Sequence, residues 1–289
     1  MADPGRLFIF GLGFSARTLA RRLLAEGWQV AGTTRSAEKR EALAAEGIEA
    51  HLFDRDQPLP PDVLAGTTHL LVSVPPDPAG DPVVDEHAAD IVALMPGLRW
   101  VGYLSTTGVY GDRQGGWVDE ETPVAPDVGR SERRVEAEVT WLNLWRDHGV
   151  PLHIFRLAGI YGPGRSAVDS VRDGKARRVI KPGQVFCRIH VEDIAQVVAA
   201  SMAQPHAGRI YNLADDEPAP PQAPIEEAAR LLGVDPPPAV DFETADLSPM
   251  ARSFYRDSRR VRNDRIKQEL GVTLKYPTYR EGLAAIAKG

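Results

Sequence analysis

A short glycine-rich turn near the amino end is the first feature of the chain that could do chemistry. It spans residues 11–16 (GLGFSA), after an apolar run and before a helical pattern. Gly11 permits a tight turn, Gly13 lets a phosphate approach the backbone, and Ala16 allows close helix packing beside a helix N-terminus rich in amide donors. We therefore predict that a dinucleotide pyrophosphate binds at Gly11, Gly13, Phe14, Ser15 and Ala16.

The end of the next predicted strand carries a cation where an NAD site typically has a carboxylate. Residues 32–36 read Gly-Thr-Thr-Arg-Ser, with no acidic residue to accept the ribose hydroxyls. Arg35 can pair with a 2′-phosphate. Further hydroxyl donors to the same phosphate are Thr33, Thr34 and Ser36. The pattern favours NADP(H) over NAD(H), and the alternative is that Arg35 points into solvent.

Two more predicted strands end in residues suited to a ligand edge. Asp54 follows the third strand, where its carboxylate can accept from an adenine amino group; a solvated turn aspartate is the alternative. Ser73 and Val74 end the fourth strand. Because open α/β sheets bind ligands at the carboxyl ends of their strands, we add Asp54, Ser73 and Val74 to the predicted cofactor site.

The elements that must position these residues alternate along the first two hundred residues. Short β-rich runs end near residues 10, 33, 53, 74, 104 and 157, and helical patterns such as 15–26 and 37–46 are closed by glycine. A later helix–strand pair, 191–202 and 209–213, would rejoin the sheet. We predict an α/β fold, a Rossmann-type doubly wound parallel sheet with a small, mostly C-terminal substrate lobe.

Proline-rich connectors divide the chain near residue 214. Prolines cluster at 218–221 and 236–238 and interrupt the regular alternation. We predict a dinucleotide-binding domain over 1–213, with an excursion near 160–187 toward a smaller substrate lobe over 214–289. Helical patterns in that second lobe cover 224–232, 263–270 and 278–287.

Composition restricts the class of partner and compartment. The 289 residues carry a formal net charge of -6, which argues against general attraction to nucleic acid or to an anionic membrane. No apolar run approaches the length of a membrane span. Cys187 is the only cysteine, so the reducing cytosol is the expected compartment. The histidines show no metal-ligand spacing, and we assign no metal.

One basic stretch departs from this acidic balance. Between Arg252 and Lys267, five further arginines outnumber Asp257 and Asp264. A solvated helix face is one interpretation, and an anion clamp for a phosphorylated substrate is the other. A nucleic-acid role is disfavoured by the overall charge.

With its later motifs added, the chain resembles the extended short-chain dehydrogenase/reductase superfamily, the NAD-dependent epimerase/dehydratase group that acts largely on nucleotide sugars. The likeness rests on the glycine turn and on motifs spread over nearly the whole chain. These are LSTTGVYG at 104–111, Arg156 with IYGPG at 160–164, IHVEDIA at 189–195 and YNL at 211–213.

The resemblance implies roles for two hydroxyls. In that family, the hydroxyl four residues before the tyrosine of the Val-Tyr-Gly triplet holds the reacting oxygen of the substrate, and here it is Thr106, with Ser105 beside it. Such a hydroxyl can stabilise charge on a carbonyl oxygen; the alternative is that both merely satisfy backbone groups. Family dehydratases continue with an Asp-Glu pair where this chain has Thr107-Gly108, which disfavours dehydration.

The catalytic Tyr-x-x-x-Lys dyad of the family has no counterpart here. Counting back from Glu138 puts Arg130 and Arg134 in those positions. Guanidinium stays charged in proteins, so neither arginine can replace the tyrosine as proton donor, although Arg134 can still grip the nicotinamide ribose. Tyr110 or Tyr161 would substitute only if the fold brings it near the reacting oxygen. The resemblance thus implies an atypical member.

Together these features predict an NADP(H)-binding oxidoreductase or epimerase-like enzyme that acts on a sugar nucleotide or related carbonyl compound. The predicted catalytic residues are Thr106, Ser105 and Arg134. A non-catalytic NADP(H) sensor or scaffold is the alternative, favoured by the vacant dyad. We expect a small-molecule substrate, with a phosphorylated compound among the alternatives and Arg165 and Arg188 facing it. A homodimer is compatible with the sequence.

Overall fold

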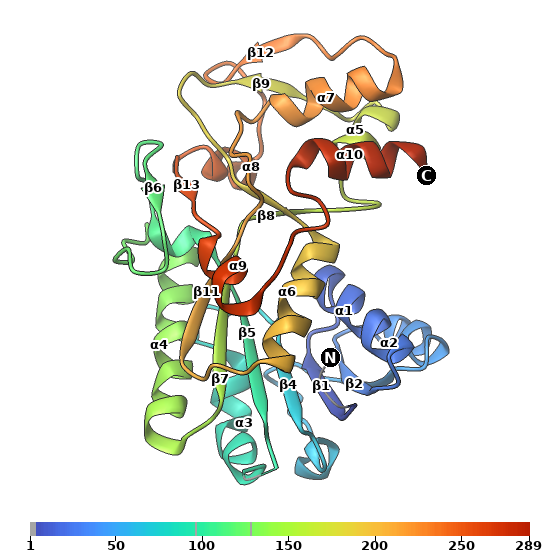
Figure 1. Ribbon diagram of the computed structural model, residues 1–289, viewed down its shortest axis with the longest axis vertical. Coiled ribbons are helices and arrows are strands. Elements are labelled where there is room, and N and C mark those ends of the chain that lie inside the picture. Colours follow the sequence, from blue (N-terminus) through green and yellow to red (C-terminus); the bar gives the residue numbers. More distant parts are fainter. Residues whose placement is uncertain (1–3, 96, 128) are drawn as a thin grey trace.

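The chain forms a central parallel sheet, and the predicted dinucleotide positions lie at or just after the carboxyl ends of its strands. The computed structural model describes residues 4–95, 97–127 and 129–289. Seven strands lie in the order β11-β7-β5-β4-β1-β2-β3, and every neighbouring pair is parallel (Figure 1). Their bounds are Arg6–Phe10 (β1), Gln29–Thr34 (β2), Glu49–Leu52 (β3), His69–Val72 (β4), Trp100–Thr106 (β5), Leu152–Leu157 (β7) and Arg209–Leu213 (β11).

Helices cover both faces of this sheet, as the predicted doubly wound fold requires. One apolar layer joins the sheet to α1 (Phe14–Ala25), α6 (Val191–Ala203) and α9 (Asp264–Leu270). The opposite layer joins it to η1 (Pro61–Leu64), α3 (Pro82–Ala93) and α4 (Arg130–His148). Strands buried on both faces need near-continuous apolar sequence, which β1 and β4 have after their first residue.

Glycine ends the first two helices as predicted. Gly27 and Gly47 adopt φ values of +86° and +82° just after α1 and α2 (Ala37–Ala45). A residue without Cβ adopts this left-handed conformation at little cost, so the chain can turn back into the next strand. The expected rejoining of the sheet is also confirmed, because β11 pairs with β7.

A second, smaller lobe stands beyond the carboxyl edge of the sheet (Figure 1). Its own apolar core gathers residues from α5, α7 and α10, including Val168, Ala228 and Leu283. The elements of this lobe are β8 (Gly159–Tyr161), α5 (Ala167–Arg172), β9 (Arg178–Ile180), β10 (Arg188–His190), α7 (Ala223–Leu232), β12 (Ala239–Asp241), α8 (Pro249–Phe254) and α10 (Tyr279–Lys288). Strands β8 and β10 pair with each other, as do β9 and β12.

The basic stretch after residue 252 is not one helix, so its interpretation as a helix face is wrong. It crosses the end of α8, the short strand β13 (Arg260–Val261) and the start of α9; β13 pairs with β6 (Trp117–Val118). Arginines of this stretch donate to main-chain carbonyls: Arg252 to Ala245 and Arg259 to Gly111. A periodic charge pattern cannot reveal such long-range partners.

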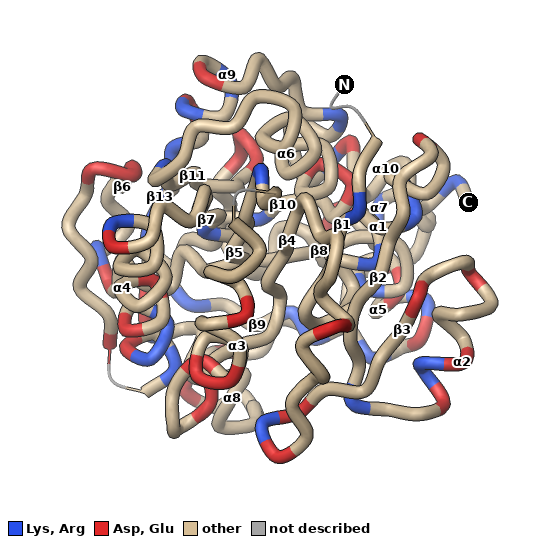
Figure 2. Tube along the Cα trace, turned by 90° about the horizontal axis from the view of Figure 1, so that it is seen from below, with Lys and Arg blue, Asp and Glu red and all other residues tan. Residues whose placement is uncertain are grey.

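Acidic and basic residues are interleaved over the trace, as around α2 and α9 (Figure 2). Across the described ranges, no helix is long and apolar enough to cross a membrane. In the same part of the chain, no group of three or more His, Cys, Asp or Glu side chains could hold a metal ion.

Candidate functional site

The glycine turn is held in place by hydrogen bonds to a threonine near the end of β2. Gly11 has φ +88°, and a Cβ there would lie 2.9 Å from Cγ2 of Val74. The Gly11 amide donates to Oγ1 of Thr33 at 2.9 Å, and the Leu12 amide donates to the Thr33 carbonyl at 2.8 Å. The predicted use of the Thr33 hydroxyl for a 2′-phosphate is therefore wrong, because this 1% exposed side chain holds the turn.

Open space lies directly beside the second glycine of the turn. A Cβ added to Gly13 would meet no atom within 4 Å, whereas Gly11 is tightly enclosed. Gly13 precedes α1, so the unpaired amides of Phe14, Ser15 and Ala16 begin the helix there. The first turn of α1 contains no acidic residue. This arrangement suits an anionic group of a dinucleotide, because helix N-termini attract negative charge.

The end of β2 presents one unpaired cation beside two hydroxyls. Arg35 is exposed and has no ion-pair partner among the described residues. The Ser36 hydroxyl caps α2 by accepting from the Lys39 amide at 3.2 Å, and the Thr34 hydroxyl accepts from the Ser36 amide at 3.3 Å. Both hydroxyl protons remain available to a ligand. Thr34, Arg35 and Ser36 thus form one polar group at the end of β2, and its use for a 2′-phosphate stays a prediction.

An ionic clasp joins the ends of β3 and β4. Asp54 is exposed and accepts from the Arg55 amide at 2.8 Å. The Arg55 guanidinium bonds Asp77 at 2.9 Å and Asp85 at 2.8 Å, and this contact lowers the pKa of the Asp77 carboxyl. Ser73 stays in register with the sheet because its amide donates to the Phe10 carbonyl at 2.8 Å. The clasp was not predicted, since its partners are remote in sequence.

A buried polar network occupies the other half of the sheet edge. The Ser105 hydroxyl donates to Glu138, which also pairs with Arg156 at 2.7 Å. Arg156 donates at 3.0 Å to the hydroxyl of Tyr110, which donates at 2.8 Å to Oδ1 of Asn212. Ser105 is 4% exposed, so its hydroxyl is committed to the support of the site. Sequence reasoning missed Glu138, whose only signal is a charge on the apolar side of α4.

Thr106 lies at the open end of β5, next to a second hydroxyl. Its Oγ1 accepts from the Gly108 amide at 3.1 Å and caps the short helix η2 (Thr107–Tyr110), and Thr106 is half-buried. A Cβ on Gly108 would approach Oγ of Ser131 at 3.1 Å and Oγ1 of Thr106 at 3.3 Å. Ser131, on the first turn of α4, therefore shares this corner and was not predicted.

The two arginines at the dyad positions diverge. Arg134 donates from Nη1 to the Tyr103 hydroxyl and to the Leu104 carbonyl, both at 3.0 Å, which places it along the end of β5. Arg130 instead donates to Oγ of Ser253 in the smaller lobe at 3.1 Å. The structure thus brings Arg134 to the strand that carries Thr106 and takes Arg130 away from it.

Neither of the remaining phenols is free to replace the missing tyrosine. Tyr110 is 0% exposed and is engaged by the buried network, and Tyr161 is 7% exposed with its hydroxyl 3.5 Å from the Thr278 carbonyl. Burial raises the pKa of both phenols. Both phenols are therefore packing residues.

Comparison with known proteins identifies the family of the chain. Residues 88–214 match the model of the NAD dependent epimerase/dehydratase family. Protein YeeZ of Escherichia coli (strain K12) is 31% identical, over 94% of this chain and 96% of its own length. The chain belongs to the NAD-dependent epimerase/dehydratase family.

Solved structures share the fold of this chain. A functionally unknown conserved protein from Silicibacter pomeroyi DSS is 55% identical, with a TM-score of 0.92 and 98% of each chain covered. The dTDP-glucose 4,6-dehydratase of Bacillus anthracis str. Ames, in complex with NAD, has a TM-score of 0.79 at 17% identity, covering 98% of this chain and 96% of its own. The second likeness shows a shared fold, and that dehydratase holds a pyridine nucleotide.

Proposed function

We propose that this epimerase/dehydratase-family chain is an NADP(H)-dependent oxidoreductase or epimerase-like enzyme that acts on a sugar nucleotide or related carbonyl compound. The observation that carries the cofactor part is Arg35, an unpaired cation at the end of β2. It stands on the same sheet edge as Gly13 and its open space. An arginine at this position matches a 2′-phosphate and offers nothing to accept the ribose hydroxyls of NAD.

The residues present fit a dinucleotide along this edge. The amides that begin α1 would hold the pyrophosphate, Arg35 and Ser36 the 2′-phosphate, and Asp54 the adenine amino group. Ser73 and Val74 complete the wall opposite Gly11, which a side chain at Gly11 would strike. When bound, the cofactor supplies a hydride donor or acceptor.

The chain contributes two groups to a reaction at the end of β5. The Thr106 hydroxyl retains its proton while it accepts from Gly108, so it can donate to a carbonyl oxygen that gains negative charge. The fixed positive charge of Arg134 lies along the same strand end and stabilises the same charge or a ribose oxygen. Ser105 supports this corner through Glu138 without touching the reacting atoms.

A test of cofactor choice uses binding alone. We expect NADPH to bind wild type about tenfold or more tightly than NADH, because hydrogen bonds to a charged group contribute about 1.5–3 kcal/mol. Arg35→Ala should remove that preference by weakening NADPH alone. Arg146→Ala, an exposed arginine in the last turn of α4, is the charge-matched control. Equal affinities of wild type for both cofactors would end the NADP(H) proposal.

A non-catalytic NADP(H) sensor or scaffold is the second candidate. It is favoured by Arg130, which turns to Ser253 and leaves the position of the proton donor without a phenol. Incubation of the protein with NADPH and a panel of nucleotide sugars, followed by nicotinamide absorbance, separates the two candidates. Turnover that falls in Thr106→Val supports the enzyme. Cofactor binding without turnover, but with a cofactor-dependent change of oligomeric state or partner, supports the sensor.

A further inference from the structure

The smaller lobe contains a pocket of its own. It has a volume of about 430 Å³ and opens among α5, α7 and α10. Its apolar lining includes Tyr279 and Leu283 of α10 and Ile225 of α7. This volume lies within the range of small-molecule sites, which are mostly apolar with a few charged groups.

Two guanidinium groups line this pocket without a carboxylate partner. Arg165 is exposed, and its guanidinium lies over the ring of Phe14, 5.7 Å from the ring centroid. Arg188 donates to the main-chain carbonyls of Phe186 and Ala219 at 3.1 and 3.4 Å and lies over the Tyr279 ring. In the ranges that the structure describes, neither arginine forms an ion pair.

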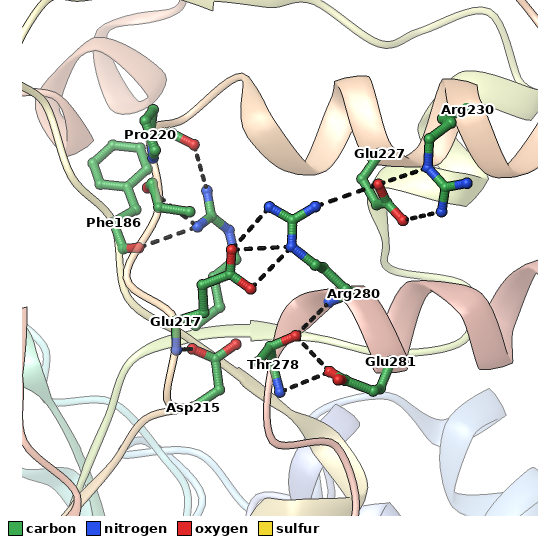
Figure 3. Close-up of polar contacts among 11 residues, drawn as sticks. Phe186, Asp215, Glu217, Pro220, Glu227, Arg230, Thr278, Arg280 and Glu281 are labelled. Atoms are coloured by element: carbon green, nitrogen blue, oxygen red, sulfur yellow. Dashed lines mark hydrogen bonds and ion pairs between the residues drawn. The ribbon is translucent and has the colours of Figure 1, made fainter.

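The carboxylates around the pocket are bonded to other residues, as Figure 3 shows for Glu217 and Glu227. Glu217 binds Arg280 at 2.9 Å, and Arg280 also reaches Glu227. Asp215, near Arg188, is 1% exposed with one oxygen unpartnered, and burial raises the pKa of its carboxyl to about 8. Its other oxygen accepts from the Glu217 amide, and no ion pair joins this carboxyl to Arg188 among the described residues.

The carboxylates inside the pocket are also engaged. Asp169 accepts from the Ser166 hydroxyl at 2.6 Å, and Asp173 pairs with Lys175 at 2.8 Å. Among the charged residues that line the pocket, the charges of Asp173 and Lys175 cancel each other. The two arginines then remain, with Asp169 as the single negative charge beside them. The pocket therefore carries an excess of positive charge beside an apolar wall.

We infer that this pocket binds a small organic anion, with its acid group at Arg165 and Arg188 and its apolar part against Tyr279, Leu283 and Ile225. The chemistry is a phosphate monoester or a carboxylate joined to an apolar group, since guanidinium binds both acids through paired hydrogen bonds. Arg165 also stacks on Phe14, the first residue of α1. The pocket is thus a second site that adjoins the glycine turn and does not require cofactor binding.

Calorimetric titration of the full chain tests the inference with two probes, phenyl phosphate and phenylacetate, and with uncharged benzyl alcohol as the control. We expect saturable binding of at least one acid with a Kd of about 1 mM or tighter, and none of the alcohol. Preference for phenyl phosphate identifies a phosphate ligand, and preference for phenylacetate identifies a carboxylate.

Variants locate the site. Arg165→Ala and Ile225→Glu should each weaken the acid about tenfold or more, because one removes a cation and the other places a like charge on the wall. Arg146→Ala, the exposed arginine at the end of α4, should bind as wild type does. Thermal unfolding of each variant shows whether it is folded, and both altered positions are partly exposed.

Two results would overturn the inference. One is the absence of saturable binding by wild type up to about 10 mM of either acid. The other is unchanged binding by both folded variants, which would place the anion elsewhere. Titration of the same proteins with NADPH is read separately, so failure of the dinucleotide proposal and failure of this pocket are distinguishable.

Discussion

The carboxyl edge of the central sheet has two halves that treat their polar groups differently. Over β1 and β2, groups are left open: space lies beside Gly13, and Arg35 stands without an ion-pair partner in the described chain. Over β5, β7 and β11, polar side chains bind one another, from Ser105 through Glu138 and Arg156. The first half can therefore accept an anionic ligand, whereas most polar side chains of the second half are already hydrogen-bonded to one another.

The difference teaches which property of the family this chain retains. Binding of a dinucleotide needs a rigid turn, free amides and a cation, and these are present. Proton transfer needs a titratable group with access to the substrate, and the phenols of Tyr110 and Tyr161 are buried and bonded. Buried polar groups must be paired, so a network that stabilises the fold also removes its members from chemistry.

The largest expected effect tests the half of the edge over β5, β7 and β11, where polar side chains bind one another. Arg156→Met should lower the free energy of unfolding by about 3–5 kcal/mol, because it leaves Glu138 as an unpaired buried charge. Arg22→Met breaks a more exposed pair with Glu26 and should cost less than about 1 kcal/mol. Urea unfolding measures both. Equal losses in the two variants would show that the buried network does not stabilise the fold.

The next prediction tests the half of the edge over β1 and β2 by placing a side chain in the open space beside Gly13. Gly13→Val should leave the free energy of unfolding within about 1 kcal/mol, since a Cβ there meets no atom within 4 Å. The same side chain would occupy the expected phosphate position and weaken NADPH about hundredfold, or about 2.7 kcal/mol. Fluorescence titration and urea unfolding separate the two effects. Retained cofactor affinity in a stable variant would mean that the dinucleotide binds elsewhere.

A pH experiment sharpens the contrast at the end of β11. Burial raises the pKa of Asp215 from 3.8 to about 8, so between these values the folded chain holds a proton that the unfolded chain releases. The contribution of this carboxyl to the free energy of unfolding is fully present at low pH and is lost as the pH rises toward 8. Asp215→Asn removes that loss, so it should gain more than about 1.4 kcal/mol relative to wild type between about pH 5 and pH 8.

The control for this measurement is Asp235→Asn, which changes an exposed carboxyl in the same way. Its difference from wild type should stay flat over the same pH window, because an exposed group interacts almost equally with solvent in both states. Urea unfolding at each pH provides the values. A flat difference for Asp215→Asn as well would refute the buried-proton explanation.

The smallest effect concerns the clasp beside the adenine position. Arg55→Gln removes the ion pairs with Asp77 and Asp85 that join the ends of β3 and β4. These groups are partly exposed, so each pair contributes at most about 1 kcal/mol, and the Kd for NADPH should rise by about fivefold or less. Cofactor titration at low and high salt measures it. A loss as large as that of Gly13→Val would place Arg55 in direct contact with the cofactor.

Much of the fold could be predicted because strands, helices and their ends are indicated by residues that lie close together in sequence. The strand ends near Phe10 and Leu157 and the helix stop at Gly27 lie where apolar runs and glycine indicate them. Asp54 likewise lies just after β3, where the sequence places it, and its contact with adenine stays a prediction. The family also follows from motifs in the sequence, and the family model that matches residues 88–214 confirms it.

The partners of polar side chains could not be predicted in the same way. Ser105 and Thr106 are adjacent hydroxyls at one strand end, yet one faces Glu138 inside the core and the other caps η2. The alternation of strand side chains separates them, and only the packing of α4 decides what each one meets. Arg259, in the basic stretch after residue 252, meets the same limit, since it donates to the carbonyl of Gly111 in a segment remote in sequence.

The sequence by itself determined the parallel sheet, the glycine turn and the charge at the end of β2, because periodicity, glycine and charge act on neighbours along the chain. The tertiary structure decided which of the predicted groups remain available. It left Gly13 and Arg35 open, enclosed Ser105 and Tyr110, and gathered Arg165 and Arg188 around a pocket. Availability depends on what packs against a side chain, and that is settled by contacts between residues far apart in sequence.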